Sequence, residues 1–116
     1  MATIYRYGGG PILSLDGGII SSYGGPHRFQ IVGDTISRYA GPPLFSINGD
    51  YVSKYAGSYI FQLNGSTFYK FAGGPIAQVN GSNISSYGGP YIFNINGYVS
   101  KKELMALLTI LFYYDL

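Results

Sequence analysis

A sixteen-residue unit repeats six times without insertion between Ile4 and Val99, and this repetition constrains the fold more than any other feature. The third copy, residues 36–51, reads ISRYAGPPLFSINGDY. Glycine occupies the sixth and the fourteenth position of every copy, so a glycine recurs at intervals of eight residues. A fixed period of this kind is typical of architectures in which small units pack against their neighbours.

The glycine at the fourteenth position follows Asn in four copies and Asp in one. Asn-Gly and Asp-Gly are the strongest short signals for a tight hairpin, because glycine adopts positive φ at little cost. The glycine at the sixth position is also surrounded by Pro and Gly, which favours a second turn in each unit. We therefore predict structural turns at Gly17, Gly33, Gly49, Gly65, Gly81 and Gly97.

The runs between the glycines are short and rich in residues that favour strands, as in Ile36–Tyr39 and Leu44–Ile47. Each repeat therefore predicts one β-hairpin, and the chain an all-β antiparallel meander of six 16-residue hairpin repeats with about twelve short strands. A flat ribbon of about twelve strands would be roughly 58 Å wide and would bury little. We expect it to be curled or closed. A β-solenoid with 16 residues per coil is the alternative fold.

Alternation along the strands assigns the side chains to two faces. In the third repeat, Ile36, Arg38, Phe45 and Ile47 are expected on one face and Tyr39 on the other. The basic residue recurs in other copies, as Arg6, Lys54 and Lys70, and is interpreted as a sparse solvated stripe rather than a nucleic-acid site. The aromatic residue recurs as a column whose candidate ligand-facing members are Tyr23, Tyr39, Tyr55, Phe71 and Tyr87.

Glycine disappears after Gly97, and a different element follows. Ser100 and Glu103 fit a capping box, which predicts one C-terminal α-helix over about residues 101–114. The helix is apolar almost all round, so it must be buried on more than one side. We divide the chain into a six-repeat β domain, residues 4–99, and an apolar helix, 100–116, that packs on the repeats or on a partner subunit. The candidate assembly residues are Leu104, Leu107, Leu108, Leu111 and Phe112.

The composition argues against catalysis. The chain has no Cys, one His and five acidic residues, and no repeat position is acidic throughout. We therefore expect no enzyme activity, no metal and no cofactor. His27 is interpreted as a solvated loop residue, and Asp34 and Asp50, which share a repeat position, as turn residues. A net charge of +2 gives no reason to expect a nucleic-acid partner.

The segments SRYAG (37–41), SKYAG (53–57) and FQLNG (61–65) combine aromatic residues, glycine and short hairpins. In this style the region from Ile4 to Val99 resembles the tandem aromatic-glycine hairpin repeats of bacterial cell-wall-binding and glucan-binding modules. The resemblance implies hairpins stacked in a superhelix. It also implies that aromatic residues of neighbouring repeats bind choline or glucan.

We expect a non-catalytic structural or interaction protein that self-associates, as a homo-oligomer or filament, through its apolar sheet, the two free sheet edges and the C-terminal helix. The alternative is a carbohydrate-binding module that uses the tyrosine column. The sequence shows no leader-like pattern, and no apolar segment reaches the roughly 20 residues that cross a bilayer. We therefore expect no transmembrane segment and a cytoplasmic location, with leaderless export left open.

Overall fold

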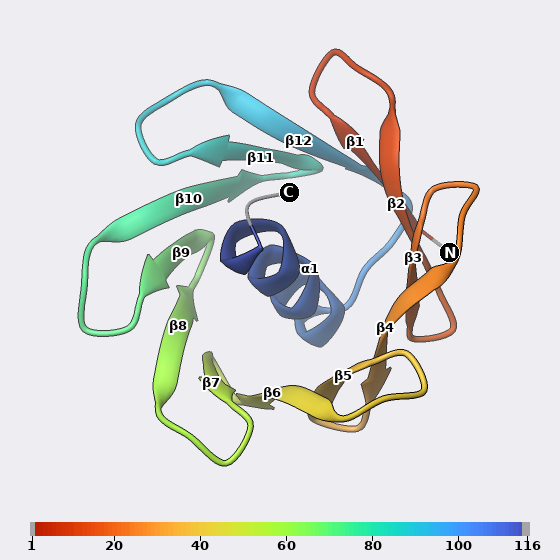
Figure 1. Cartoon of the computed structure of the whole chain (residues 1–116). Coiled ribbons are helices and arrows are strands. Elements are labelled where there is room, and N and C mark those ends of the chain that lie inside the picture. The colour runs from red at the N-terminus through yellow and green to blue at the C-terminus, as the bar shows by residue number, and fades with distance from the viewer. Residues whose placement is uncertain (1, 115–116) are drawn as a thin grey trace.

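The computed structural model describes residues 2–114 and contains a closed antiparallel barrel around one helix (Figure 1). Successive strands are hydrogen-bonded neighbours, and β1 also pairs with β12. The strands are β1 Ala2–Arg6, β2 Pro11–Asp16, β3 Ile19–Ser22, β4 His27–Val32, β5 Thr35–Arg38, β6 Pro43–Asn48, β7 Tyr51–Lys54, β8 Tyr59–Asn64, β9 Thr67–Lys70, β10 Pro75–Asn80, β11 Asn83–Ser86 and β12 Tyr91–Asn96.

This topology confirms the all-β meander and its closure, and the solenoid alternative is wrong because the neighbouring strands run antiparallel. The expectation of two free sheet edges is also wrong. The edges meet where Ile4 faces Ile95, and the Tyr7 N–H donates to the Ile92 carbonyl at 2.9 Å. The superhelical stacking implied by the family resemblance is likewise replaced by a ring of hairpins.

Each repeat carries a bulge that bends the sheet. In the third repeat Ile36 faces Phe45 and Ser37 faces Pro43, so Leu44 is an extra residue without a partner. The same shift occurs inside all six hairpins, whereas the pairing between successive repeats is regular. Because bulges increase local twist and bend a strand, six of them help the short strands to close.

Glycine occupies two positions in every repeat, and the two positions have different structural roles. Gly49 has a φ of +61° and is the first of two loop residues between Asn48 and Tyr51, the place where a type II′ turn needs glycine. Gly41 lacks a positive φ, but an added Cβ would lie 3.1 Å from the Arg38 Cβ. The preceding Ala40 carries the positive φ, at 54°.

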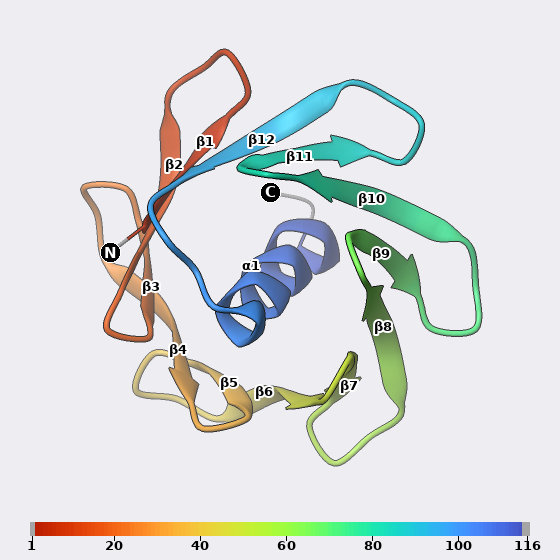
Figure 2. The ribbon, with the colours of Figure 1, turned by 180° about the vertical axis from the view of Figure 1, so that it is seen from behind.

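Five of the six predicted turn glycines join strands, with φ between 58° and 63°. Among these five turns, two consecutive positive φ values, the pattern of a type I′ turn, occur only at Gly17 and Gly18. Gly97 is different, because it follows β12 and begins the connection to the helix, with a φ of 112°. Figure 2 shows this connection from behind, running from β12 to the start of α1.

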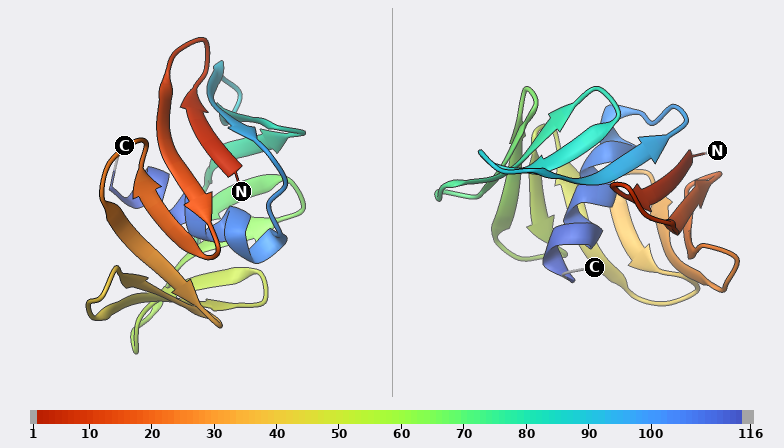
Figure 3. Two further views of the ribbon diagram at one scale, coloured as in Figure 1. Left: turned by 90° about the vertical axis from the view of Figure 1, so that its right-hand side faces the viewer. Right: turned by 90° about the horizontal axis from the view of Figure 1, so that it is seen from above.

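Helix α1, Lys101–Tyr113, lies inside the barrel, and strands surround it in the side views of Figure 3. The predicted capping box is present: the Glu103 N–H donates to Ser100 Oγ at 3.2 Å, and the Ser100 N–H donates to Glu103 Oε1 at 2.9 Å. Every residue from Met105 to Leu111 is buried. Thr109, the one polar residue in that run, donates its hydroxyl to the Met105 carbonyl.

The inward faces of the strands supply the rest of the core. Ile36, Phe45 and Ile47, which alternation assigned to one face, are all buried, and Phe29 and Phe68 are among the largest fully buried side chains. A single curved sheet can bury this face only by wrapping around something apolar, and α1 fills that space. No helix among residues 2–114 has the length and apolar character to cross a membrane.

Candidate ligand-binding surface

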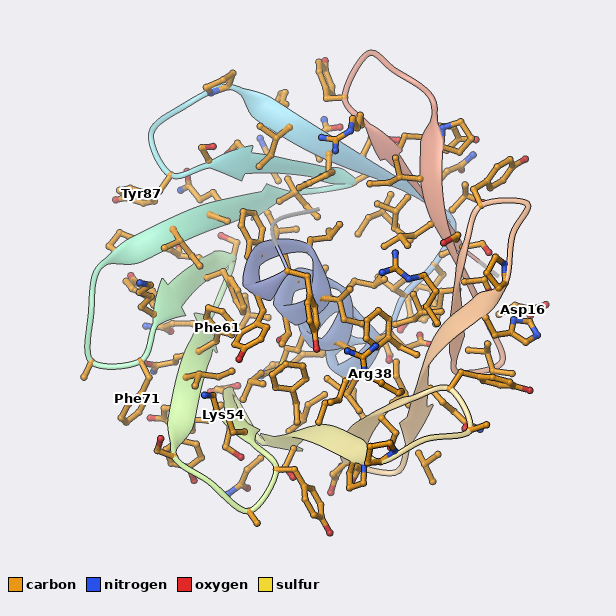
Figure 4. The ribbon with its side chains drawn as sticks, viewed as in Figure 1. Asp16, Arg38, Lys54, Phe61, Phe71 and Tyr87 are labelled. Carbon is orange, nitrogen blue, oxygen red and sulfur yellow. The ribbon has the colours of Figure 1, made fainter. Side chains whose placement is uncertain are left out.

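The predicted aromatic column lies on the outside of the barrel. Its five candidate residues follow directly after odd-numbered strands and are between 42% and 55% exposed: Tyr23, Tyr39, Tyr55, Phe71 and Tyr87. Backbone hydrogen bonds fix all five to the preceding repeat; the N–H groups of Tyr39 and Tyr55, for example, donate to the carbonyls of Arg28 and Leu44 at 2.9 Å. Phe71 and Tyr87 lie at the periphery in Figure 4.

Two of the five, Tyr39 and Phe71, contact aromatic rings outside the column. Phe71 lies 5.2 Å from the Tyr59 ring and 5.7 Å from the Tyr51 ring, and Tyr51 stacks on Tyr59 at 5.0 Å. The Asn48 amide donates to Tyr59 Oη at 3.1 Å, which orients that ring. Tyr59 begins β8, the second strand of the hairpin that precedes the one containing Phe71. The same repeat position is Pro, Tyr or His in different copies.

The first and last repeats form a second aromatic pair across the closure of the barrel. Tyr7 lies 5.2 Å from Tyr91, and the Asn80 amide donates to Tyr91 Oη at 3.1 Å. Tyr91 also lines a surface hollow of about 520 Å³ together with Gln78 and Ser85. Tyr7 lines a neighbouring hollow of about 270 Å³. An exposed aromatic pair therefore lies beside two polar hollows.

A third cluster contains the single histidine. His27 Nδ1 lies 2.7 Å from Ser21 Oγ, and the imidazole lies 4.7 Å from the Tyr39 ring. A serine hydroxyl on an imidazole is part of the arrangement that activates a nucleophile, but that chemistry also needs a group to orient the imidazole. Within residues 2–114 no carboxylate forms an ion pair with His27.

The candidate assembly residues of the helix are enclosed by the barrel. Leu107, Leu108 and Leu111 are buried by the strands, and Leu104 and Phe112 are half-buried. Phe112 packs 6.1 Å from both Phe68 and Phe93. Leu107, Leu108 and Leu111 therefore form the centre of the core, whereas Leu104 and Phe112 remain partly exposed.

The aspartates and the helix lysines meet at one opening of the barrel. Lys101 Nζ contacts Asp50 Oδ1, and Lys102 Nζ lies 2.6 Å from Asp34 Oδ1. Both aspartates lie on hairpin turns, as predicted. We call this end of the barrel, around Ser100–Glu103, the N-opening. Among residues 2–114 no three His, Cys, Asp or Glu side chains gather closely enough to hold a metal ion.

Sequence reasoning missed the residues that complete the aromatic clusters. It selected one aromatic column, whereas the structure places Tyr51, Tyr59 and Tyr91 against members of that column. The available signal was the repeat position occupied by His27, Tyr59 and Tyr91, which is Pro in the other three copies. No family model, no curated protein and no solved structure matches the chain.

Proposed function

We propose that the protein is a non-catalytic carbohydrate-binding module that holds sugars against its outer aromatic clusters. The observation that carries the proposal is the exposed Tyr7–Tyr91 pair beside a hollow lined by Gln78, Asn80 and Ser85. Sugars present apolar C–H faces and a rim of hydroxyls, so they need a flat aromatic surface next to amide and hydroxyl groups. Sites for small ligands combine these features: a concave, largely preformed surface with a few placed polar groups.

The arrangement favours several weak sites over one strong site. Aromatic residues recur around the barrel, and the Tyr51–Tyr59–Phe71 cluster repeats the aromatic-plus-amide pattern through Asn48. Repeated sites on one rigid body raise the affinity for a polymeric ligand, because the second binding event becomes intramolecular. A polysaccharide is therefore a better expected ligand than a single monosaccharide.

A glycan array followed by calorimetric titration with the best polysaccharide tests the proposal. We expect Tyr91→Ala to remove binding at the first hollow and Asn80→Ala to weaken it, because the Asn80 amide holds the Tyr91 hydroxyl. Tyr98→Ala is the matched control, since Tyr98 is 85% exposed and lines neither hollow beside the aromatic pair. Absence of any glycan response, or equal losses in all three variants, overturns the proposal.

Self-association is the second candidate, and one observation favours it. The outer surface exposes many large apolar side chains while only 10% of the residues are charged. A homo-oligomer would have to use these outward aromatic rings, because the barrel leaves no free edge among residues 2–114 and encloses the helix. Light scattering tests it: Tyr59→Ser with Phe71→Ser should convert an oligomer to a monomer, and a parent protein that is monomeric at high concentration excludes this candidate.

A further inference from the structure

The opening at the other end of the barrel, where α1 ends near Tyr113, carries four basic side chains that share one repeat position. We call it the C-opening. Each basic residue pairs across the strands with an inward-facing Phe: Arg6 with Phe93, Arg38 with Phe29, Lys54 with Phe45 and Lys70 with Phe61. Aromatic contacts from these phenylalanines to Phe112, Tyr113 and Tyr114 place this ring at the helix C-terminus. Figure 4 shows Arg38, Lys54 and Phe61 on the inner side of the sheet.

The charges of the C-opening are not neutralised by the residues that the structure describes. The ion pairs within residues 2–114 are Lys101–Asp50 and Lys102–Asp34, and both lie at the N-opening. Arg38, Lys54 and Lys70 come from three successive repeats, so they form a continuous basic arc, which we call the cationic arc. The second and sixth repeats carry Ser22 and Ser86 at this repeat position, so the rest of the ring is less charged.

A cavity of about 510 Å³ lies at one end of the cationic arc. Its lining is apolar apart from Lys70 and includes Phe61, Phe71, Ile76, Phe112 and Tyr113. This volume is typical of small-molecule sites, which are mostly apolar with a few polar groups that orient the ligand. The described barrel therefore places an apolar hollow and an unpaired ammonium group side by side.

We propose that this cavity binds a small amphipathic anion, of the class of a medium-chain fatty acid. The acyl chain lies against Phe61, Ile76 and Phe112, and the carboxylate accepts hydrogen bonds from the Lys70 ammonium, with Lys54 adding charge along the arc. This ligand class is supported because its acyl chain matches the apolar lining of the cavity and its carboxylate matches the Lys70 ammonium. A neutral apolar molecule would make no charge-assisted hydrogen bond with the Lys70 ammonium, and a simple inorganic anion would leave the cavity unfilled. The cavity shares Phe71 with the outer Tyr51–Tyr59–Phe71 cluster, but its lining includes neither Tyr7 nor Tyr91, the pair on which the sugar proposal rests.

Calorimetric titration of the full chain with octanoate tests the inference, with acetate and 1-octanol as partial ligands. We expect octanoate to bind more tightly than either partial ligand. Lys70→Gln should weaken octanoate binding about tenfold or more, because it removes the charge-assisted hydrogen bond. Arg6→Gln is the matched control: it removes an equivalent charge from a strand that does not line the cavity and should change affinity less than about twofold.

Ile76→Trp provides a second, independent variant, since it fills the cavity and should abolish octanoate binding while Lys70 remains. A circular dichroism spectrum checks that each variant is folded. Equal binding of acetate and octanoate, or octanoate binding unaffected by both Lys70→Gln and Ile76→Trp, overturns the inference. Titration with anionic phospholipid vesicles gives a further check. If the vesicles bind, if Arg6→Gln and Lys70→Gln weaken that binding equally, and if free octanoate does not bind, the inference is overturned and the result indicates a surface-charge effect.

Discussion

The Lys101 ammonium at the start of the helix contacts the Asp50 carboxylate on the β6–β7 turn. Lys102 makes the same contact with Asp34 one repeat earlier, so two turns hold the first turn of α1. Acidic groups near a helix N-terminus and basic groups near its C-terminus both favour the helix dipole. At the N-opening Asp34 and Asp50 offset Lys102 and Lys101, whose charges are unfavourable at a helix N-terminus, and the cationic arc lies at the helix end where basic groups are favourable.

The Lys101–Asp50 pair should add little stability by itself. The two side chains are 59% and 51% exposed, and exposed pairs contribute about 0.2–1 kcal/mol. A double-mutant cycle with Asp50→Asn and Lys101→Gln, followed by urea unfolding, should give a coupling free energy below about 1 kcal/mol. The coupling should shrink further in 1 M salt, where screening acts over about 3 Å. A coupling above about 2 kcal/mol would contradict this surface assignment.

The hairpin architecture could be predicted because its signals are local. The glycine period, the alternation around Phe45 and the capping box of Ser100 and Glu103 each specify structure within a few residues. Closure of the barrel was not specified in this way, because β1 and β12 lie at opposite ends of the repeats. It depends on the sum of twist and bulges over six hairpins, and no single segment encodes that sum.

The outer clusters were only partly predictable for a related reason. Alternation separated Tyr39 and Phe71 from the face that carries Phe45, but their partners His27 and Tyr59 come from the neighbouring repeat. The same limit applies to the basic residues. Their column was visible as a stripe, whereas its position around the end of α1 follows from the way the sheet encloses the helix.

Truncation of the central helix should be costly. Leu107 is fully buried near the middle of α1, and Leu→Ala changes in such sites lower the free energy of unfolding by about 2–5 kcal/mol. Chemical unfolding of Leu107→Ala, monitored by circular dichroism, should show a loss in this range. Tyr98→Ala, at an exposed site, should stay within about 0.5 kcal/mol of the parent protein. A loss below about 1 kcal/mol for Leu107→Ala would contradict a helix enclosed by the barrel.

The turn glycines should differ in their tolerance of a side chain. Gly49 has a φ of +61° and open space around its Cβ position, so Gly49→Ala tests backbone strain alone. We expect a loss of about 1 kcal/mol in the free energy of unfolding. Gly74 is the control, because its φ is not positive and its Cβ position is also open. Gly74→Ala should be neutral or slightly stabilising, and equal effects at both sites would contradict the turn geometry.

Closure of the barrel should be visible in amide hydrogen exchange. The Tyr7 N–H donates to the Ile92 carbonyl between the first and last hairpins, as the Tyr39 N–H donates to the Arg28 carbonyl between neighbouring hairpins, both at 2.9 Å. Both amides should therefore exchange slowly, with protection factors within about tenfold of each other, since equal hydrogen bonding in one cooperative unit gives similar opening free energies. The Gly10 amide, which lies in a hairpin loop, gives the reference for fast exchange. Exchange of the Tyr7 amide as fast as that of Gly10, with the Tyr39 amide still protected, would mean that β1 and β12 are open edges. The sheet could then pair with the strands of other chains.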